Sequence, residues 1–558
     1  MMLAAKEQEQ KRAIYKLFNF RPVLFAAIFL CLGIIFSYFH KTKGVVSAWS
    51  LLVFPAAAAV LYFSVERLGK KKTIVFFAVL CISFFVGSIA LNVQLEKYSD
   101  TPSYNGEYTV IGKIVGTHPY ANSQKVLLSD LKIDGERVDG KLTAYLPTTS
   151  LGKASLSDVV ILKGELRSDI EYFNEYGFAA EKIHDDIRFQ MKEVSSWHKT
   201  GEKFDLFLWM QNRWQITIHA GMDETPASVT IALLTGDTAG IENGLLDNIR
   251  YGGIAHIFAV SGLHVGALFG FCLLLEKKTK LRYAPKLLRF LLLAVLLLFY
   301  AGVCGFSASI IRATTLCLVT YAATLIGTKT DFLATIGLSA IVVLLLSPVS
   351  LFEIGFQLSF TACLGLALFT RPIREGIEKG LEYVEKKGKL PTREERVMRA
   401  KTNTSPPSVS KRIQKACIDF LSGCIAAQLA TAPIQMQVFG YLSVWSLLLN
   451  CIFVPLVSAV FSILLAFIAA LSLLPSFFAA TLLYASSACW SLLLLIFEAA
   501  DFSSFAITGL RFSFGAFFTY YAGLLFFTDK WNLKKQEKVR AVILCFVIFV
   551  ATMVALNI

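Results

Sequence analysis

The stretch GGIAHIFAVSGLHVGALFG (residues 252–270) decides the fold class. It is long and apolar enough to be part of a membrane span, yet it contains His256, Ser261 and His264, which lipid does not solvate. Polar side chains inside a span are costly, and they usually face the interior of a helix bundle or a water-filled cavity. The stretch therefore predicts a membrane protein with a polar interior.

The composition of the whole chain agrees with a membrane protein. Of its 558 residues, 55% are hydrophobic and 17% are charged, whereas a soluble domain carries about 25% charged residues. The net charge of +14 is explained by lysines and arginines that collect in cytoplasmic loops. The eleven cysteines have no CxxC or zinc-type spacing. We therefore expect no bound metal and no cofactor.

Apolar segments recur along the chain and predict a membrane all-α bundle of about 13 transmembrane helices. The predicted spans are 22–39, 45–63, 73–91, 252–275, 286–303, 305–326, 331–347, 351–370, 416–438, 441–473, 476–498, 503–527 and 540–556. Pro455 interrupts the long segment 441–473, which predicts a half-helix followed by a full helix.

The basic residues predict how the chain crosses the membrane. They precede the first span, separate the second from the third and fill the loop 371–415. The positive-inside rule places all three regions, and with them the N-terminus, in the cytoplasm. We therefore expect a multi-pass protein of the cytoplasmic membrane, with residues 95–200 outside the cell.

Residues 95–200 have the pattern of a small β domain. Candidate strands are 107–116, 124–133, 136–147, 158–168 and 187–197, with a helix near 175–183. Asp134 and Gly135 join two of the strands in a hairpin turn. Five short strands and one helix suit a barrel of the OB type, although other small β domains fit the strand count equally well.

The chain thus divides into four predicted parts. Residues 1–94 form an N-terminal membrane region of three spans, 95–200 the outer β domain, 201–251 an amphipathic connector and 252–558 a second membrane domain. Within the connector, 203–222 could lie flat in the membrane interface or pack on protein as an ordinary amphipathic helix.

Nine polar side chains lie in or beside the predicted spans and are our candidate site residues. They are His256, Ser261, His264, Arg312, Glu353, Gln357, Gln428, Gln435 and Asn450. A path lined by such groups, without a ring of carboxylates, suits an anionic polymer better than a metal cation. The alternatives are hydrogen bonds that only hold helices together, and an ion pair between Arg312 and Glu353.

Two further patterns surround Ser261. Gly262, Gly266 and Gly270 are spaced four apart, which predicts close packing of another helix. Ser261 and His264 are three apart, so a helix would let them touch and form the dyad of an intramembrane hydrolase. A metal site on His256 and His264 would lack a third ligand.

Four sequence blocks resemble the ComEC family of DNA-uptake channels. They are GIAHIFAVSGLHVG (253–266), GFSASIIRATTLCLVTYAATLIG (305–327), SPVSLFEIGFQLSFTACLGL (347–366) and APIQMQVFGYLSVWSLLLNCIFVPLVS (432–458). Arg312 stands where the family has an arginine, whereas Ala308 replaces the family's usual proline. The resemblance identifies 252–558 as a ComEC-type competence domain.

The resemblance implies a channel that passes single-stranded DNA across the cytoplasmic membrane in natural transformation. It also implies three partners besides DNA and membrane lipid: a DNA receptor of the ComEA type, a cytoplasmic ATPase of the ComFA type and a nuclease. Many family members carry a metallo-β-lactamase-type domain with an HxHxDH cluster. The seven histidines here form no such cluster, so we expect no enzyme activity and a separate nuclease.

Other readings stay open at the level of the sequence. A secondary transporter of a small anion would use the same broken helices and polar groups. An intramembrane hydrolase would use Ser261 and His264. The sequence fits a monomer and a homo-oligomer equally.

Overall fold

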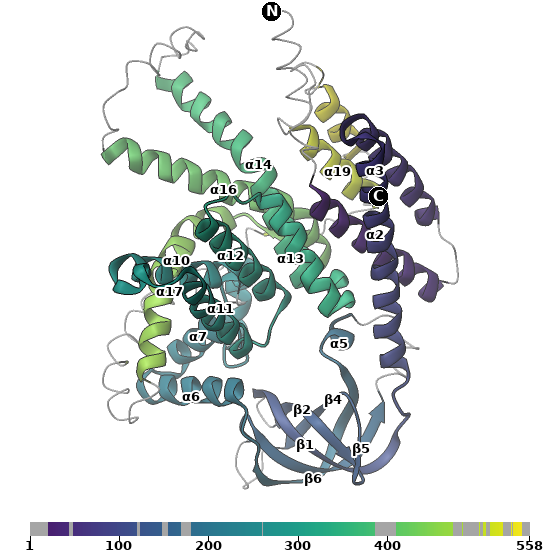
Figure 1. The fold of residues 1–558 in the computed structure, drawn as a ribbon. Helices are drawn as coiled ribbons and strands as arrows, with labels where there is room; N and C mark the ends of the chain where they lie inside the picture. Colours follow the sequence, from purple (N-terminus) through teal and green to yellow (C-terminus); the bar gives the residue numbers. More distant parts are fainter. Residues whose placement is uncertain are drawn as a thin grey trace, which may run out of the picture.

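The structure is a computed structural model, which describes most of the chain. The described residues are 21–43, 48–119, 123–147, 154–168, 180–258, 261–385, 409–471, 506–508, 514–527 and 540–549, with Leu483, Phe502 and Glu537. Helices predominate, and a small β domain lies at one end of their bundle (Figure 1). The predicted combination of a helical membrane part with one small β domain is confirmed.

Six helices of the described part are long and apolar enough to cross a membrane. They contain Pro22–His40, Ile74–Ser99, Lys286–Val303, Ala308–Ile326, Ile354–Val384 and Arg412–Phe439. One bent pair, Ser446–Ser458 with Ile463–Ala470, would make a seventh, and Phe332–Leu346, Gly515–Phe526 and Arg540–Phe549 are shorter apolar helices. The predicted number of about 13 spans is therefore not reached in the described residues. The predicted span 476–498 lies outside them, apart from Leu483.

The N-terminal membrane region consists of α2 (Pro22–Lys43) and α3 (Ala48–Ser99), which pack side by side. The second and third predicted spans both fall in α3, whose backbone is helical through the basic stretch between them. Gly33 of α2 and Gly87 of α3 lie at the contact. A Cβ on either glycine would run into a backbone carbonyl of the other helix, at Phe84 and Leu30 respectively. Glycine is therefore what lets these two helices approach so closely.

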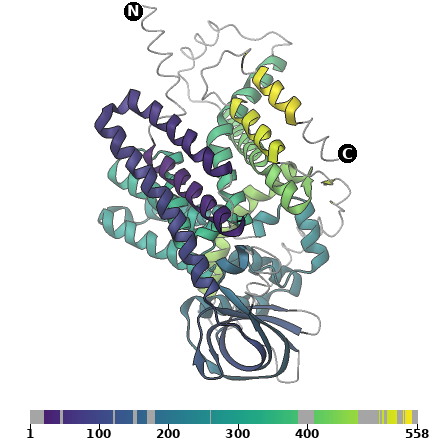
Figure 2. The same cartoon turned by 90° about the vertical axis from the view of Figure 1, so that its right-hand side faces the viewer.

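The β domain is a closed sheet. Its strands are β1 (Asn105–Pro119), β2 (Ser123–Ile133), β3 (Glu136–Arg137), β4 (Lys141–Pro147), β5 (Asp158–Ser168) and β6 (Ile187–Glu202). The order is β1-β5-β6-β4-β2-β3, and an added β1–β2 pairing closes the ring, which Figure 2 shows nearly end-on. β4 and β6 run parallel, whereas the other pairs are antiparallel.

The sequence located this domain's strands well. All five predicted strands are present, but 136–147 is interrupted at Gly140, where φ is +112°. Asp134 and Gly135 both have positive φ in the predicted turn between β2 and β3. Of the predicted helix near 175–183, the described part is α5 (Ala180–His184). Alternate residues of β2 and β5 are buried, as expected for strands that enclose a core.

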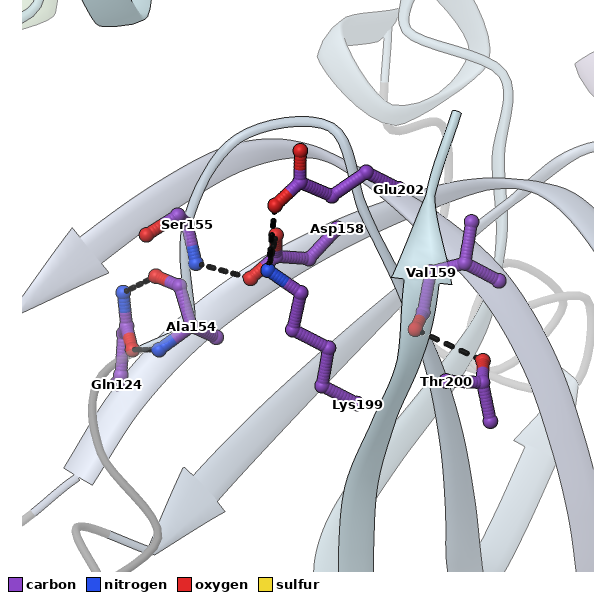
Figure 3. A network of polar contacts seen from close by, with 8 residues as sticks. All are labelled: Gln124, Ala154, Ser155, Asp158, Val159, Lys199, Thr200 and Glu202. Carbon is purple, nitrogen blue, oxygen red and sulfur yellow. Dashed lines mark hydrogen bonds and ion pairs between the residues drawn. The ribbon is translucent and has the colours of Figure 1, made fainter. Parts of the chain in front are cut away.

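Polar contacts fix the turn that leads into β5 (Figure 3). The side-chain amide of Gln124 makes two hydrogen bonds with the backbone of Ala154, at 2.8 and 3.0 Å. Asp158 accepts a hydrogen bond from the Ser155 N–H at 2.9 Å and pairs with Lys199 at 2.8 Å. These contacts connect β2, β5 and β6 at one end of the barrel. They also satisfy backbone groups of the turn that the hydrogen bonds between strands do not reach.

Three helices connect the barrel to the second membrane domain. They are α6 (Leu206–Gly221), α7 (Glu224–Thr235) and α8 (Asn243–Tyr251). α6 lies between the barrel and the bundle (Figure 1) and buries Trp214 and Ile218, so it packs on protein. α7 is buried over most of its length and belongs to the core of the bundle. The predicted connector 201–251 is therefore partly core.

The predicted span 252–275 is not one helix. The chain forms α9 (Ala255–Phe258) and then α10 (Gly262–Lys278), which starts afresh at Ser261. Gly253 has φ of +74°, and Ser261 has an extended conformation; neither angle fits an α-helix. His256 and His264 therefore do not share one helix face, contrary to the prediction.

The remaining elements complete the helical bundle. They are η1 (Lys280–Tyr283), α11 (Lys286–Val303), α12 (Ala308–Ile326), α13 (Phe332–Leu346), η2 (Pro348–Phe352), α14 (Ile354–Glu385), α16 (Val409–Phe439), β7 (Tyr441–Ser443), α17 (Ser446–Leu471), β8 (Ala506–Thr508) and α19 (Phe514–Phe527). In this bundle α2 also packs on α13. The predicted segment 441–473 begins with β7, which pairs with β8. It continues as α17, whose two parts Ser446–Ser458 and Ile463–Ala470 are bent by 43°, so the predicted break is present, just after Pro455 instead of at it.

Pro433 lies inside α16 and frees carbonyl groups that a membrane helix must satisfy. The hydroxyl groups of Tyr520 and Tyr521 on α19 donate to the carbonyl oxygens of Leu429 and Ala430, at 2.8 and 2.9 Å. Leu429 is the residue four before the proline, so its carbonyl loses its usual helical donor. The tyrosines thus tie α19 to α16 at the proline.

Candidate functional site

Ser261 and His264 cap the start of α10. The Oγ of Ser261 accepts a hydrogen bond from the backbone N–H of Leu263 at 3.3 Å. The backbone N–H of Ser261 donates to Nδ1 of His264 at 3.0 Å. Ser261 thus accepts from one free backbone N–H of the first turn of α10. His264, three residues later, accepts in turn from the backbone N–H of Ser261, so that the two residues form a capping box. The two residues touch, as the spacing predicted, but as a helix cap.

This arrangement does not suit an intramembrane hydrolase. A nucleophilic serine needs its Oγ hydrogen-bonded to a basic nitrogen. Here Nδ1 of His264 accepts from the backbone of Ser261 and not from its hydroxyl, which places the imidazole proton on Nε2. His264 is fully buried, its ring lies 4.6 Å from that of Phe461, and Nε2 has no hydrogen-bond partner among the described residues.

Arg312 lies on the first turns of α12 and is 6% exposed. Its Nε donates to Ser359 Oγ at 2.9 Å and its Nη1 to Cys363 Sγ at 2.5 Å, both on α14. Within the described part of the chain no carboxylate forms an ion pair with it. A buried charge that is removed from water without a counter-charge costs several kcal/mol. The described partners of the guanidinium are thus neutral: Ser359, Cys363 and the ring of Phe360, whose centroid lies 5.7 Å from Cζ.

Gly262 lies against this guanidinium. A Cβ at Gly262 would stand 2.8 Å from Nη2 of Arg312 and 3.4 Å from Cβ of Ala313. Gly266 and Gly270 differ, because no atom of the described residues lies within 4 Å of their Cβ positions. Close helix packing is thus found at Gly262, whereas at the other two glycines it stays a prediction.

A second polar junction joins α16, α17 and the break before α9. Ser446, the first residue of α17, donates from Oγ to Gln428 Oε1 at 3.0 Å and accepts from Asn450 Nδ2 at 3.0 Å. The same Oγ lies 3.4 Å from the carbonyl oxygen of Gly253. A Cβ at Gly253 would stand 2.5 Å from Cβ of Ser446, so glycine is needed there for its φ and for its size.

Glu353 pairs with the β domain and not with Arg312. Its Oε1 lies 2.6 Å from Nδ1 of His184 on α5. Ser347 and Ser350 also place their hydroxyl oxygens 3.1 and 3.0 Å from this nitrogen. The sequence alternative that Arg312 and Glu353 form an ion pair is therefore wrong. The contact instead holds α5 of the β domain against η2 of the helical bundle.

We expect this contact to weaken as the pH rises. The pKa of His184 is raised above 6.5, chiefly because the imidazolium donates a hydrogen bond to the Glu353 carboxylate, although burial opposes the shift. Asp185 also raises it and Lys141 lowers it. A raised folded-state pKa means that the stabilisation is complete below pH 6.5 and is lost as the pH passes the raised value.

Thermal unfolding of the detergent-solubilised protein at a series of pH values checks this. The unfolding temperature of the wild type should fall more between pH 6 and pH 9 than that of His184→Gln. His198→Gln, which changes an exposed histidine on β6, should behave like the wild type. Identical pH profiles of the wild type and His184→Gln would contradict the assignment.

The remaining candidate residues contact groups that are close to them in the sequence. Gln357 donates to the carbonyl oxygen of Leu351 at 3.2 Å, and Gln435 to Thr431 one turn earlier at 3.2 Å. His256 has an exposed side chain and interacts with the backbone of Gly253. No group of three potential metal ligands is found in the described part of the chain.

Most of the polar side chains thus fall into three groups, and His256, which interacts with Gly253 and with His264, lies between the first two groups. The three groups are the α10–Arg312 group, the Ser446 junction and the His184–Glu353 contact. Sequence reasoning did not single out Ser446, Ser359, Cys363 or His184. Ser446, Ser359 and Cys363 lie in the family blocks and His184 in the predicted β domain. A single serine, cysteine or histidine in such a segment does not indicate by itself that it contacts another part of the chain.

Comparisons with known proteins agree with these blocks. The family model described as "Competence protein" matches residues 233–534. "ComE operon protein 3" of Bacillus subtilis (strain 168) is 35% identical to the chain over 138 residues, which is 25% of this chain and 17% of that protein. The match therefore spans less than a fifth of the relative's length. No solved structure matches the chain.

Proposed function

Because the chain belongs to the competence protein family, we propose that it is a channel that passes single-stranded DNA across the cytoplasmic membrane. Membership of the family supports a role in competence and DNA uptake. The long apolar helices and the polar side chains between them support a channel. The observation that carries the proposal is Arg312, a buried guanidinium without a carboxylate partner among the described residues. A passing phosphate would supply the missing charge.

Non-helical backbone inside the membrane domain supports a water-filled path. In lipid, irregular backbone is tolerated only where it is buried in protein or lines an aqueous cavity. The chain leaves helical geometry at Gly253, at Ser261 and at Gly440, where φ is +75°. Two of these breaks, at Gly253 and after Gly440, meet at Ser446. We place the path along these breaks and the polar residues beside them.

The outer domain fits the OB type. This is supported by its closed ring of five main strands, in which β1 pairs with both β2 and β5 and β4 runs parallel to β6. We propose that it receives DNA from a ComEA-type receptor. A ComFA-type ATPase would pull the strand from the cytoplasm, and a separate nuclease would degrade the other strand.

Transformation tests the channel. A naturally competent host that lacks its own ComEC-type protein should recover uptake of labelled DNA into a nuclease-protected form when it expresses this chain. Normal protein levels in the membrane without uptake would overturn the proposal. A small-anion transporter, which the broken helices also favour, would leave DNA uptake absent and anion flux intact.

The proposed topology has its own test. The β barrel and the far ends of α14 and α16 lie at opposite ends of the bundle (Figure 1), which supports opposite membrane faces for 95–200 and 371–415. In a background without native cysteines, Ser123→Cys should react with an impermeant thiol reagent in intact cells. Ser405→Cys should react only after lysis. Labelling of Ser405→Cys from outside would contradict this topology.

A further inference from the structure

Three aromatic side chains meet at the break between α16 and α17. Phe439 is the last residue of α16, Tyr441 the first of β7, and Tyr251 the last of α8. The ring centroids of Tyr251 and Tyr441 are 4.6 Å apart with the planes tilted by 41°, and those of Phe439 and Tyr441 are 6.2 Å apart. Two segments far apart in the sequence thus contribute to one aromatic cluster.

The cluster lies at the edge of the bundle's core, against which Tyr251 packs. Phe439 is 50% exposed, and both tyrosines are partly exposed. None of the three is among the fully buried side chains of the bundle's core. Arg250, next to Tyr251, is more than half exposed and pairs with Asp247 at 3.0 Å. Partly exposed rings therefore lie beside an exposed Arg250–Asp247 ion pair.

The backbone holds the rings in place. Gly440 takes a positive φ of +75° between Phe439 and Tyr441, and β7 pairs with β8 and packs on α8 and α16. Ser443 and Ser446 then contact Gly253, two residues after Tyr251. The aromatic cluster is thus directly continuous with the polar junction at Ser446.

We propose that Phe439, Tyr441 and Tyr251 form a stacking platform for the bases of single-stranded DNA. This inference rests on the proposed function and adds a second kind of contact to it. Arg312 would meet phosphates, whereas the platform takes the flat faces of the bases. Every base has such a face, so the contact tolerates any sequence, as a DNA-uptake channel requires.

The chemistry favours a single strand over other occupants. The bases of a duplex are already stacked on one another and offer no free faces along its length. A small anion has no flat apolar face for the rings to contact. A nucleotide offers flat faces to the rings, and polar edges and phosphates to the two tyrosine hydroxyls and the neighbouring guanidinium.

Oligonucleotides with and without bases test the platform. We would measure binding to the detergent-solubilised protein by fluorescence anisotropy, with oligo-dT and an abasic oligonucleotide of equal length and charge. The wild type should bind oligo-dT about tenfold more tightly, because each stacked base contributes on the order of 1–3 kcal/mol. The double variant Tyr251→Ala/Tyr441→Ala should lose that preference and bind the abasic strand unchanged.

Two matched variants complete the experiment. Tyr441→Trp keeps an aromatic face and should retain the preference for bases. Tyr283→Ala removes an exposed tyrosine on η1, away from the cluster, and should bind like the wild type. Gel filtration and thermal unfolding show whether each variant is folded.

The possible results separate this inference from the proposed function. Equal affinity of the wild type for both oligonucleotides would overturn the platform but leave a phosphate-binding channel. An equal loss of both affinities in the double alanine variant would show that the rings only support the fold. Binding of neither oligonucleotide by the folded wild type would overturn the platform together with the channel.

Discussion

Replacing Arg312 by glutamate is expected to reduce DNA uptake to the background level while the protein still inserts in the membrane. The substitution places an anion next to Gly262 and α14, where the proposed path must accommodate phosphates. Arg312→Lys keeps the charge but loses the planar fork that reaches Ser359 and Cys363 together. Because a hydrogen bond to a charged group contributes about 1.5–3 kcal/mol, we expect it to retain only part of the uptake. Nuclease-protected uptake per unit of membrane protein measures both.

Charge swaps provide the control for Arg312. Adding Glu353→Arg should not rescue Arg312→Glu, because Glu353 pairs with His184. Arg289, by contrast, pairs with Glu276 at 2.5 Å, so Arg289→Glu should be rescued by Glu276→Arg. Rescue of the Arg312 variant by the Glu353 swap would show that Arg312 holds helices together and does not meet DNA.

Alanine at Gly33 or Gly87 is expected to destabilise the N-terminal membrane region strongly. At either position the new methyl group meets a backbone carbonyl of the partner helix, and a backbone group cannot rotate away. Overpacking of a well-packed interior costs about 1–3 kcal/mol, and separation of α2 from α3 would add the loss of their other contacts. Thermal unfolding in detergent and protein levels in the membrane measure the effect.

A third glycine gives a control with the opposite sign. Gly380 lies in α14, and no described atom stands within 4 Å of its Cβ position. Alanine in an exposed helix is favoured over glycine by about 0.5–1 kcal/mol, so Gly380→Ala should be neutral or stabilising. If Gly33→Ala and Gly87→Ala unfold at the same temperature as Gly380→Ala, then α2 and α3 do not approach each other as closely as the structure shows.

These glycines mark the limit of sequence patterns. The four-residue spacing pointed to Gly262, Gly266 and Gly270, and of these only Gly262 has a close described neighbour. Gly33 is the only glycine of α2, and α3 has Gly87 and the distant Gly69, so neither helix shows a four-residue glycine spacing. A close approach depends on which two helix faces meet, and nothing in the local sequence of either helix states its partner.

The sequence by itself determined the class of this protein, the apolar segments and nearly every strand of the outer barrel. The reason is local, because continuous hydrophobicity requires lipid and strict alternation requires a sheet with one buried face. The blocks that resemble the family are also continuous stretches of sequence, so they can be recognised without the structure. Only the tertiary structure shows that the segment 252–275 is broken at Gly253 and Ser261. It also shows which polar side chains pair with each other. His184 with Glu353 and Ser446 with Gln428 are contacts between distant segments. Only the packed bundle brings such groups within hydrogen-bonding distance, since a polar side chain in an apolar segment must find a partner but does not specify which one.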